Sequence, residues 1–249
     1  MTVLKFLLAG VLSTVLTVAP VNWGLGGFGN DRVPTAPSDG VKLLGQYNGL
    51  YHVPTDEKKI FLTFDLGYEA GFTGEILDIL KENGLKAVFF LCGNYLQEGD
   101  LINRMIDEGH TIGNHTDRHR DLPKLDKAGV VTDIMTLQND FIAKYPHARA
   151  PKFFRPPQGR IDEKTMQVAS ENGFRTVMWS LAIKDWSKTP IDHIASADKL
   201  AGRLHPGAII LLHITNAGMP KTLRTLLPLV KERGYTIGEP SEYTESRPV

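Results

Sequence analysis

Short, nearly continuous apolar runs alternate with amphipathic stretches along the chain from residue 59 onward. Apolar runs of this length, bounded by turn residues, are typical of strands that are buried on both faces. They predict seven strands, at 60–64, 87–91, 111–112, 153–154, 176–179, 208–212 and 235–237. The stretches between them have a helical period. They predict helices at 74–83, 101–108, 128–144, 163–172, 191–204 and 221–233.

Turn and capping residues support this division. Asn83-Gly84, Asn172-Gly173 and Arg233-Gly234 look like helix ends, and Thr189-Pro190-Ile191-Asp192 looks like a helix start. A helix-glycine-strand rhythm repeated this often predicts an α/β fold with a parallel sheet. Seven strands without an interrupting domain favour a closed or nearly closed β/α barrel, and an open doubly wound sheet is the alternative.

The N-terminal part differs in texture from the rest. Residues 6–19 are apolar and uncharged, which is typical of the central region of an export signal. Because Pro20 is a poor first residue for a mature chain, residues 1–19 are predicted to be either a signal peptide or an N-terminal membrane anchor; a buried apolar helix is the other alternative. Residues 20–58 are predicted to be a linker and a loosely packed lead-in, and residues 59–249 a single domain.

Composition narrows the class of protein. The 28 Lys and Arg residues balance the 28 Asp and Glu residues, so no net charge favours a nucleic-acid partner, and a neutral substrate is compatible. Cys92 is the only cysteine, which excludes an intramolecular disulfide. It lies in an apolar run, so we expect a buried and unreactive thiol.

His115 and His119 are the first candidates for chemistry. Two imidazoles four residues apart on a helical turn point the same way and can bind one divalent cation. With eight His residues in 249, a close pair also arises by chance, and two solvated surface histidines are the alternative.

Polar residues directly after the predicted strands strengthen the functional interpretation. In β/α barrels, catalytic groups lie where strands end, at one mouth of the barrel. Five polar residues are predicted there: Asp65, His115, Arg155, Asp185 and His213. Asp65 suits a general base or a metal ligand, with a cap of the following loop as the alternative, and a strand-end imidazole such as His213 can protonate a leaving amine.

The neighbouring residues predict how this centre is held and what it binds. Arg155 precedes Pro156 and Pro157, which restrict its backbone, and we expect its guanidinium to bind a carboxylate, with Asp185 as the natural partner. A purely structural salt bridge is equally compatible. Tyr68, Trp179 and Trp186 are aromatic rings on or beside the same loops; such rings suit the faces of sugars, although core packing competes.

From about Lys59 to Gly238, the chain resembles the polysaccharide deacetylase family, carbohydrate esterase family 4, with its NodB-like domain. The matching segments are Thr63-Phe64-Asp65, His115 to His119, Arg155-Pro156-Pro157, Asp185-Trp186 and Leu211-Leu212-His213. The resemblance implies a distorted (β/α)7 barrel and hydrolysis of N-acetyl groups by a water bound to a divalent cation, with Zn²⁺ expected. It assigns the metal to His115 and His119, catalysis to Asp65, His213, Arg155 and Asp185, and substrate binding to Trp186, Tyr68 and Pro156.

Within the family, the segments 64–69, 179–186 and 205–207 look most like bacterial peptidoglycan N-acetylmuramic acid deacetylases, which act in forming the muramic δ-lactam of the spore cortex. This implies an exported monomer that acts on peptidoglycan glycan strands, in the cell wall or on the extracytoplasmic face of the membrane. Deacetylation of N-acetylglucosamine in peptidoglycan or chitin-like chains is the alternative.

One residue departs from the family pattern. Most members carry a second aspartate after the first and use it as the third metal ligand, whereas this chain has Leu66. The muramic acid subgroup tends to have asparagine there. Leucine cannot bind a cation, so two histidines are the evident ligands unless Asp65 joins them. An impaired site that only binds glycan is therefore a further alternative.

Overall fold

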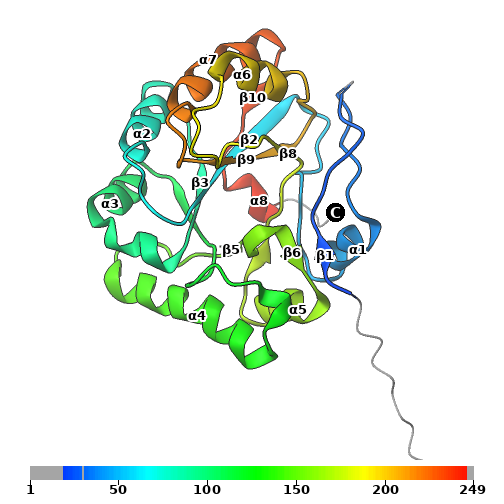
Figure 1. Cartoon of the computed structure of the whole chain (residues 1–249), viewed down its shortest axis with the longest axis vertical. Helices are drawn as coiled ribbons and strands as arrows, with labels where there is room; N and C mark the ends of the chain where they lie inside the picture. Colours follow the sequence, from blue (N-terminus) through cyan, green and yellow to red (C-terminus); the bar gives the residue numbers. More distant parts are fainter. Residues whose placement is uncertain (1–18, 30, 246–249) are drawn as a thin grey trace, which may run out of the picture.

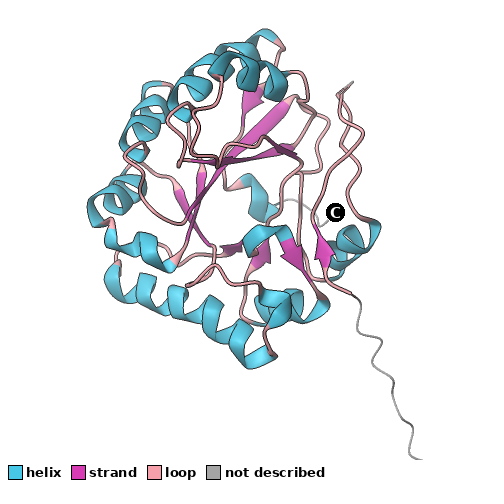
Figure 2. Cartoon of the chain, in the orientation of Figure 1, coloured by secondary structure: helices cyan, strands magenta, loops and turns pink. Residues whose placement is uncertain are grey.

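A curled sheet of parallel strands forms the centre of the molecule, and helices cover its outer face (Figures 1 and 2). The computed structural model describes residues 19–29 and 31–245. The strands lie in the order β7 (Arg175–Thr176), β5 (Phe153–Phe154), β4 (Thr111–Asn114), β3 (Val88–Leu91), β2 (Lys59–Leu66), β9 (Ala208–His213) and β8 (Leu181–Ala182). A further strand, β10 (Thr236–Ile237), pairs with the start of β2.

Strand register brings the functional residues to one edge of this sheet. Asp65 on β2 is level with His213 on β9, and Asn114 on β4 is level with Phe154 on β5. His115 and Arg155 are the next residues along their strands. Because all pairings in this sheet are parallel, these residues lie at the same carboxyl edge, as predicted for a β/α barrel.

Successive side chains of β2 point to opposite faces of the sheet and belong to two separate apolar clusters. Ile60, Leu62 and Phe64 pack outward into the core beneath the helices, whereas Phe61 packs inside the curl with residues of β3 and β9. Tyr243 of the short helix α8 (Glu242–Glu245) packs inside the curl with Phe61. The centroids of the two rings lie 5.2 Å apart. Asp65 therefore faces inward and Leu66 faces the outer core.

The predicted helices are present with small shifts of their ends. They are α2 (Thr73–Glu82), α3 (Gly99–Asp107), α4 (Lys127–Lys144), α5 (Glu163–Glu171), α6 (His193–Ala201) and α7 (Met219–Glu232). Asp126, Asp162 and Asp192 cap α4, α5 and α6 by accepting hydrogen bonds from backbone N–H groups of the first turn. The expected distorted barrel of the NodB-like type is confirmed as a curled parallel half-barrel.

One predicted strand is wrong in detail. Residues 176–179 do not form a continuous strand: β7 ends at Thr176 and β8 begins at Leu181. The carbonyl oxygens of Val177 and Met178 accept hydrogen bonds from the buried guanidinium of Arg155. The backbone of Thr176 and Met178 also pairs with Leu50, which forms a parallel bridge with Val177.

Residues 20–58, for which we expected a linker and a loose lead-in, are well packed over much of their length. Strand β1 (Val21–Asn22) pairs antiparallel with β6 (Arg160–Ile161), and helix α1 (Ser38–Gln46) buries Leu44 against Trp23 and its neighbours. The apolar residues of this segment are interrupted by Gly, Pro and Asn, so their common face appears only in the folded chain.

The predicted signal peptide or membrane anchor lies almost entirely outside the described residues, which begin at Ala19. Within 19–29 and 31–245, no helix combines the length and the apolar character needed to cross a membrane.

Candidate active site

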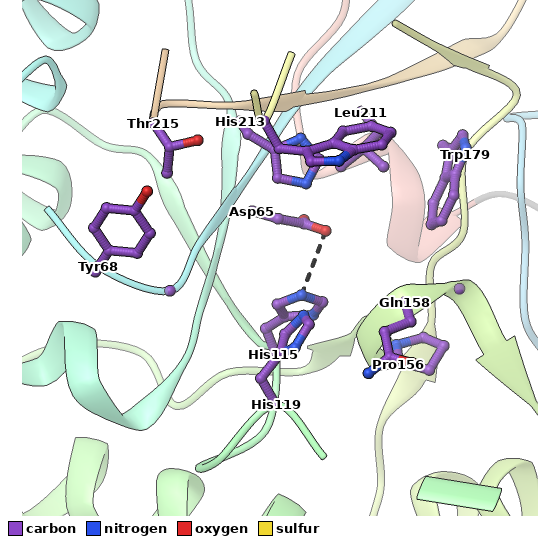
Figure 3. A pocket seen from close by; sticks show the side chains of 13 residues that line it. Asp65, Tyr68, His115, His119, Pro156, Gln158, Trp179, Leu211, His213 and Thr215 are labelled. Atoms are coloured by element: carbon purple, nitrogen blue, oxygen red, sulfur yellow. Dashed lines mark ion pairs between the residues drawn. The ribbon is translucent and has the colours of Figure 1, made fainter. Parts of the chain in front are cut away.

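A cavity of about 570 Å³ opens at the carboxyl edge of the sheet (Figure 3). Most of the residues predicted for the site contribute to its wall. The lining residues are Asp65, Gly67, Tyr68, His115, His119, Pro156, Gln158, Gly159, Trp179, Trp186, Leu211, His213 and Thr215. Arg155 and Asp185 are absent from this lining because both are fully buried behind it.

The two histidines of the predicted metal pair face each other across a loop. Their ring centroids lie 5.0 Å apart. The helical turn that we predicted for them is wrong, because they lie in the loop after β4, where Thr116 and His119 have positive φ angles of 68° and 51°. The Thr116 hydroxyl accepts a hydrogen bond from the His119 N–H at 3.0 Å, which stabilises this unusual backbone.

His115 is oriented as a metal ligand requires. Its Nδ1 donates to the Arg155 carbonyl oxygen at 2.8 Å, which leaves Nε2 as the unprotonated nitrogen facing the cavity. Burial lowers the pKa of His115 to about 4, so the imidazole is neutral at neutral pH. Its Nε2 lies 3.6 Å from Oδ2 of Asp65, the contact drawn as a dashed line in Figure 3.

Asp65 is held by a buried arginine. Arg155 Nη1 donates to Asp65 Oδ1 at 2.8 Å and to the Thr63 hydroxyl at 2.8 Å. Burial acts to raise the pKa of the Asp65 carboxyl, but the charge and hydrogen bond of Arg155 together with the nearby His115 and His213 outweigh this effect, and the pKa lies below its ordinary value. Asp65 is therefore an ionised carboxylate with one oxygen bound to Arg155 and the other turned toward His115.

The guanidinium of Arg155 is fixed on every side. Its Nε donates to the Val177 carbonyl at 2.9 Å and its Nη2 to the Met178 carbonyl at 3.1 Å, while its plane lies 4.1 Å from the ring centroid of Phe90. The prediction that this arginine binds a carboxylate is confirmed. The predicted partner, Asp185, is wrong: Arg155 reaches across the curl to β2, whereas Asp185 follows β8, the neighbour of β9.

Asp185 binds His213 instead. Its Oδ2 accepts the His213 backbone N–H and its Oδ1 accepts Nδ1–H of the imidazole, both at 2.8 Å. Burial acts to lower the pKa of His213, but the hydrogen bond and charge of Asp185 together with the charge of Asp65 outweigh it, so the pKa is raised above its ordinary value. His213 is thus stabilised as an imidazolium, and its Nε2 remains for contact with a substrate.

Aromatic rings border this polar centre. Tyr68 and Trp186 are 61% and 56% exposed, which is high for rings of this size, and Trp179 is half-buried in the wall. The Trp186 ring centroid lies 5.6 Å from that of His213. Pro156 lines the cavity as predicted, although it is buried. All three predicted substrate-binding residues therefore reach the cavity.

Several lining residues were missed in the sequence. Gln158 is the most distinctive, because it is exposed, lines the cavity and has a φ angle of 61°. Its only sequence signal is its place after two prolines and before a glycine. Leu211 and Thr215 flank His213 at the end of β9, and no chemical feature distinguishes them from core and loop residues.

The donor set for a cation is only partly assembled. The neutral imidazole of His115 and the neighbouring ring of His119 suit one divalent ion. Within the described part of the chain, no group of three or more His, Cys, Asp or Glu side chains is arranged to hold a metal. Leu66, at the position of the usual third ligand, is 1% exposed in the outer core. The residues therefore fit a cation through two histidines.

A cavity at the carboxyl ends of parallel strands that gathers a carboxylate, two imidazoles and a carboxylate-bound imidazole has the composition of a hydrolytic active site. The family model described as polysaccharide deacetylase matches residues 52–177, and the chain belongs to this family.

Relatives extend the match beyond that segment. The peptidoglycan-N-acetylmuramic acid deacetylase PdaA of Bacillus subtilis is 35% identical over 87% of this chain and 83% of its own length. A peptidoglycan-N-acetylglucosamine deacetylase of Bacillus cereus is 33% identical over 86% of this chain and 78% of its own. The solved structure of B. subtilis PdaA, a family 4 carbohydrate esterase, superposes with a TM-score of 0.82 at 32% identity, covering 91% of this chain and 97% of that one.

Proposed function

We propose that this protein hydrolyses N-acetyl groups of peptidoglycan sugars, with N-acetylmuramic acid as the principal target. The observation that carries the proposal is the pairing of an Arg155-bound carboxylate, Asp65, with an Asp185-bound imidazolium, His213, on one cavity. Relatives named for deacetylation of both peptidoglycan sugars support the substrate class, and the similarity to PdaA favours muramic acid. Formation of the muramic δ-lactam of the spore cortex belongs to the same proposal.

Asp65 is the base in this mechanism. An amide carbonyl is a poor electrophile, so the attacking water must lose a proton as it adds. The ionised carboxylate of Asp65 accepts that proton through Oδ2, because Oδ1 is bound to Arg155. Arg155 acts as a positioning residue: it is buried, touches no substrate, and keeps the carboxylate ionised and in one orientation.

His213 is the acid. Breakdown of the tetrahedral intermediate requires a proton on the departing nitrogen, because an amide anion is a very poor leaving group. The imidazolium of His213 donates this proton, and Asp185 keeps it charged and aligned from the buried side. The products are acetate and a free amino sugar. Exposed rings of Tyr68 and Trp186 are placed to pack on the neutral faces of the glycan.

His115 and His119 would hold a divalent cation, which we propose is Zn²⁺. When bound there, the cation would polarise the carbonyl group and the attacking water. The neutral, singly hydrogen-bonded imidazole of His115 is prepared for this role. Because the substrate is a cell-wall polymer, we also propose that the protein is exported by way of residues 1–19 and acts outside the cytoplasm as a monomer.

Mass spectrometry of muropeptides tests the choice of sugar. Purified protein with added zinc is incubated with peptidoglycan that carries side peptides and with peptidoglycan from which an amidase has removed them. Loss of about 42 mass units, one acetyl group, from muramic acid residues is the expected result. Loss only from glucosamine residues would replace muramic acid by the alternative target.

A glycan-binding protein without catalysis is the second candidate. The observation in its favour is Leu66 in the outer core, together with the absence of a three-donor metal set among residues 19–29 and 31–245. Under this alternative, sedimentation with peptidoglycan is retained, while no acetate is released with any of zinc, cobalt or manganese.

A further inference from the structure

We infer that Glu69 is a positioning residue that fixes the ring of Tyr68 at the rim of the cavity, and so determines glycan affinity. The inference rests on the proposed function for its kinetic consequence. Tyr68 and Glu69 are adjacent in the loop that joins β2 to α2. Tyr68 lines the cavity and is 61% exposed, whereas the Glu69 side chain turns away from it into a polar cluster.

The Glu69 carboxylate accepts hydrogen bonds with both oxygens. Oε1 accepts the backbone N–H groups of Gly71 at 2.5 Å and Thr73 at 3.4 Å. Oε2 accepts hydrogen bonds from the hydroxyl groups of Thr73 and Tyr95, the second at 2.7 Å. The two hydroxyl groups also contact each other at 2.9 Å. One side chain therefore joins three segments: its own loop, the start of α2 and the 3-10 helix η1 (Gly93–Gln97).

This cluster is anchored in the core. Tyr95 has no exposed surface and packs with the outer core, so its hydroxyl is a fixed donor for Glu69. Burial acts to raise the pKa of Glu69, but the hydrogen bonds from Thr73 and Tyr95 outweigh it and the pKa is lowered. Glu69 is thus ionised, and its hydrogen bonds are of the stronger, charge-assisted kind.

Two glycines lie close to Tyr68 in this loop. Tyr68 is preceded by Gly67, and Gly71 has a φ angle of 91°, which a residue with a side chain rarely adopts. The Tyr68 ring is exposed rather than packed. In Figure 3 the ring stands on the opposite side of Asp65 from Trp179, and both aromatic residues line the cavity. A ring held in advance loses less conformational entropy when a sugar packs on it.

Kinetics of acetate release from peptidoglycan test the coupling of the two residues. Glu69→Gln keeps the size of the side chain but cannot accept the Thr73 and Tyr95 hydroxyl groups with its amide nitrogen. We expect KM to rise about three- to tenfold with kcat changed less than about twofold, and Tyr95→Phe to change KM in the same direction. Tyr68→Ala should raise KM by at least as much.

A double-mutant cycle distinguishes positioning from a general structural role. If Glu69 acts through Tyr68, Glu69→Gln raises KM no further in the Tyr68→Ala background. Additive effects on KM, or an equal loss of kcat, would overturn the inference. Glu75→Gln is the matched control, because Glu75 is an exposed carboxylate on α2 whose nearest cation, Arg224, lies 3.9 Å away; it should leave both constants unchanged.

Hydrogen exchange provides a readout that needs no activity. In Glu69→Ala, the amide groups of Gly71 and Thr73 lose their acceptor, so peptides covering 67–73 should exchange faster than in the wild type, while Glu75→Ala leaves them unchanged. Unchanged exchange in Glu69→Ala would refute the role of Glu69. Absence of acetate release from every wild-type sample would instead refute the proposed function, and the exchange result would still decide what Glu69 holds.

Discussion

Replacement of Arg155 by methionine should destabilise the fold strongly, and the loss should depend on the charge of Asp65. Arg155 has no exposed surface and donates to four acceptors: Asp65, the Thr63 hydroxyl, and the Val177 and Met178 carbonyl oxygens. Methionine fills the space of the arginine side chain up to about Nε without introducing a polar atom, so the main change is the loss of the guanidinium donors.

The magnitude follows from what is left behind. Removal of one partner of a buried ion pair costs about 3–5 kcal/mol. Each buried acceptor without a donor costs about 1–3 kcal/mol. Water from the adjacent cavity can reach Asp65, which reduces the first cost. With the first cost reduced to about 2 kcal/mol by this water, and about 1–2 kcal/mol for each of the Val177 and Met178 carbonyl groups, the free energy of unfolding should fall by about 4–6 kcal/mol, a large part of the total for a domain.

Urea denaturation followed by circular dichroism measures this change. With a slope of about 3 kcal/mol per molar urea for a chain of this size, the midpoint should fall by about 1.3–2 M. In an Asp65→Asn background the stranded charge is gone, so the double variant should be about 2 kcal/mol more stable than the sum of the single effects. Arg224→Met, at an exposed surface pair with Glu82, is the control and should leave the midpoint unchanged.

Additivity would refute this reasoning. If Arg155→Met lowers the stability equally in the wild-type and in the Asp65→Asn background, the ion pair contributes no coupling and Arg155 serves only its carbonyl and hydroxyl partners. A midpoint within about 0.3 M of the wild type would contradict the account of the buried acceptors as well.

Three further predictions concern the cavity. Asp185→Asn removes a charge that raises the pKa of His213, so this pKa should fall. Because the acid must be protonated, kcat should begin to decrease at a lower pH than in the wild type, which a pH–rate profile measures. In a double alanine variant of His115 and His119, elemental analysis after dialysis against zinc should find no bound metal, whereas the wild type retains about one zinc ion per chain. Trp186→Ala should raise KM for glycan about fivefold with little change in kcat.

Each of these has its own control and contrary outcome. Asp198→Asn, an exposed carboxylate on α6, should leave the pH profile unchanged, and an unmoved basic limb in Asp185→Asn would contradict the acid role of His213. Zinc retained by the double alanine variant would place the metal elsewhere. Ile194→Ala removes an exposed apolar side chain outside the cavity, and a KM change equal to that of Trp186→Ala would show that the tryptophan has no specific contact.

Much of the fold was predictable because buried strands and capped helices have strong local signals. The run 60–64 is apolar at every position except Thr63, and the Asn-Gly pairs end their helices where expected. The packing of residues 20–58 was not predicted, because Trp23 and Leu44 join one apolar cluster only after α1 has folded against β1. After Thr176 the chain pairs with Leu50, a residue more than a hundred positions away.

The candidate site was also predictable only in part. Strand ends in a parallel sheet share one edge, so the meeting of Asp65, His115 and His213 followed from the sequence. The hydrogen-bond partners of these residues did not follow from the sequence. Arg155 binds Asp65, and Asp185 binds His213, because pairing across the curl depends on the strand order, which no local pattern encodes. The left-handed loop at His119 and the cluster around Glu69 also require the tertiary fold.

Acetate release from peptidoglycan by the zinc-loaded protein tests the central claim most directly. The wild type should release acetate in proportion to the free amino sugar formed, whereas Asp65→Asn and His213→Gln should each lower kcat by about a hundredfold or more while the protein stays folded and bound to glycan. Release that is unchanged in either variant, or absent from the wild type on every peptidoglycan supplied with zinc, would contradict the account.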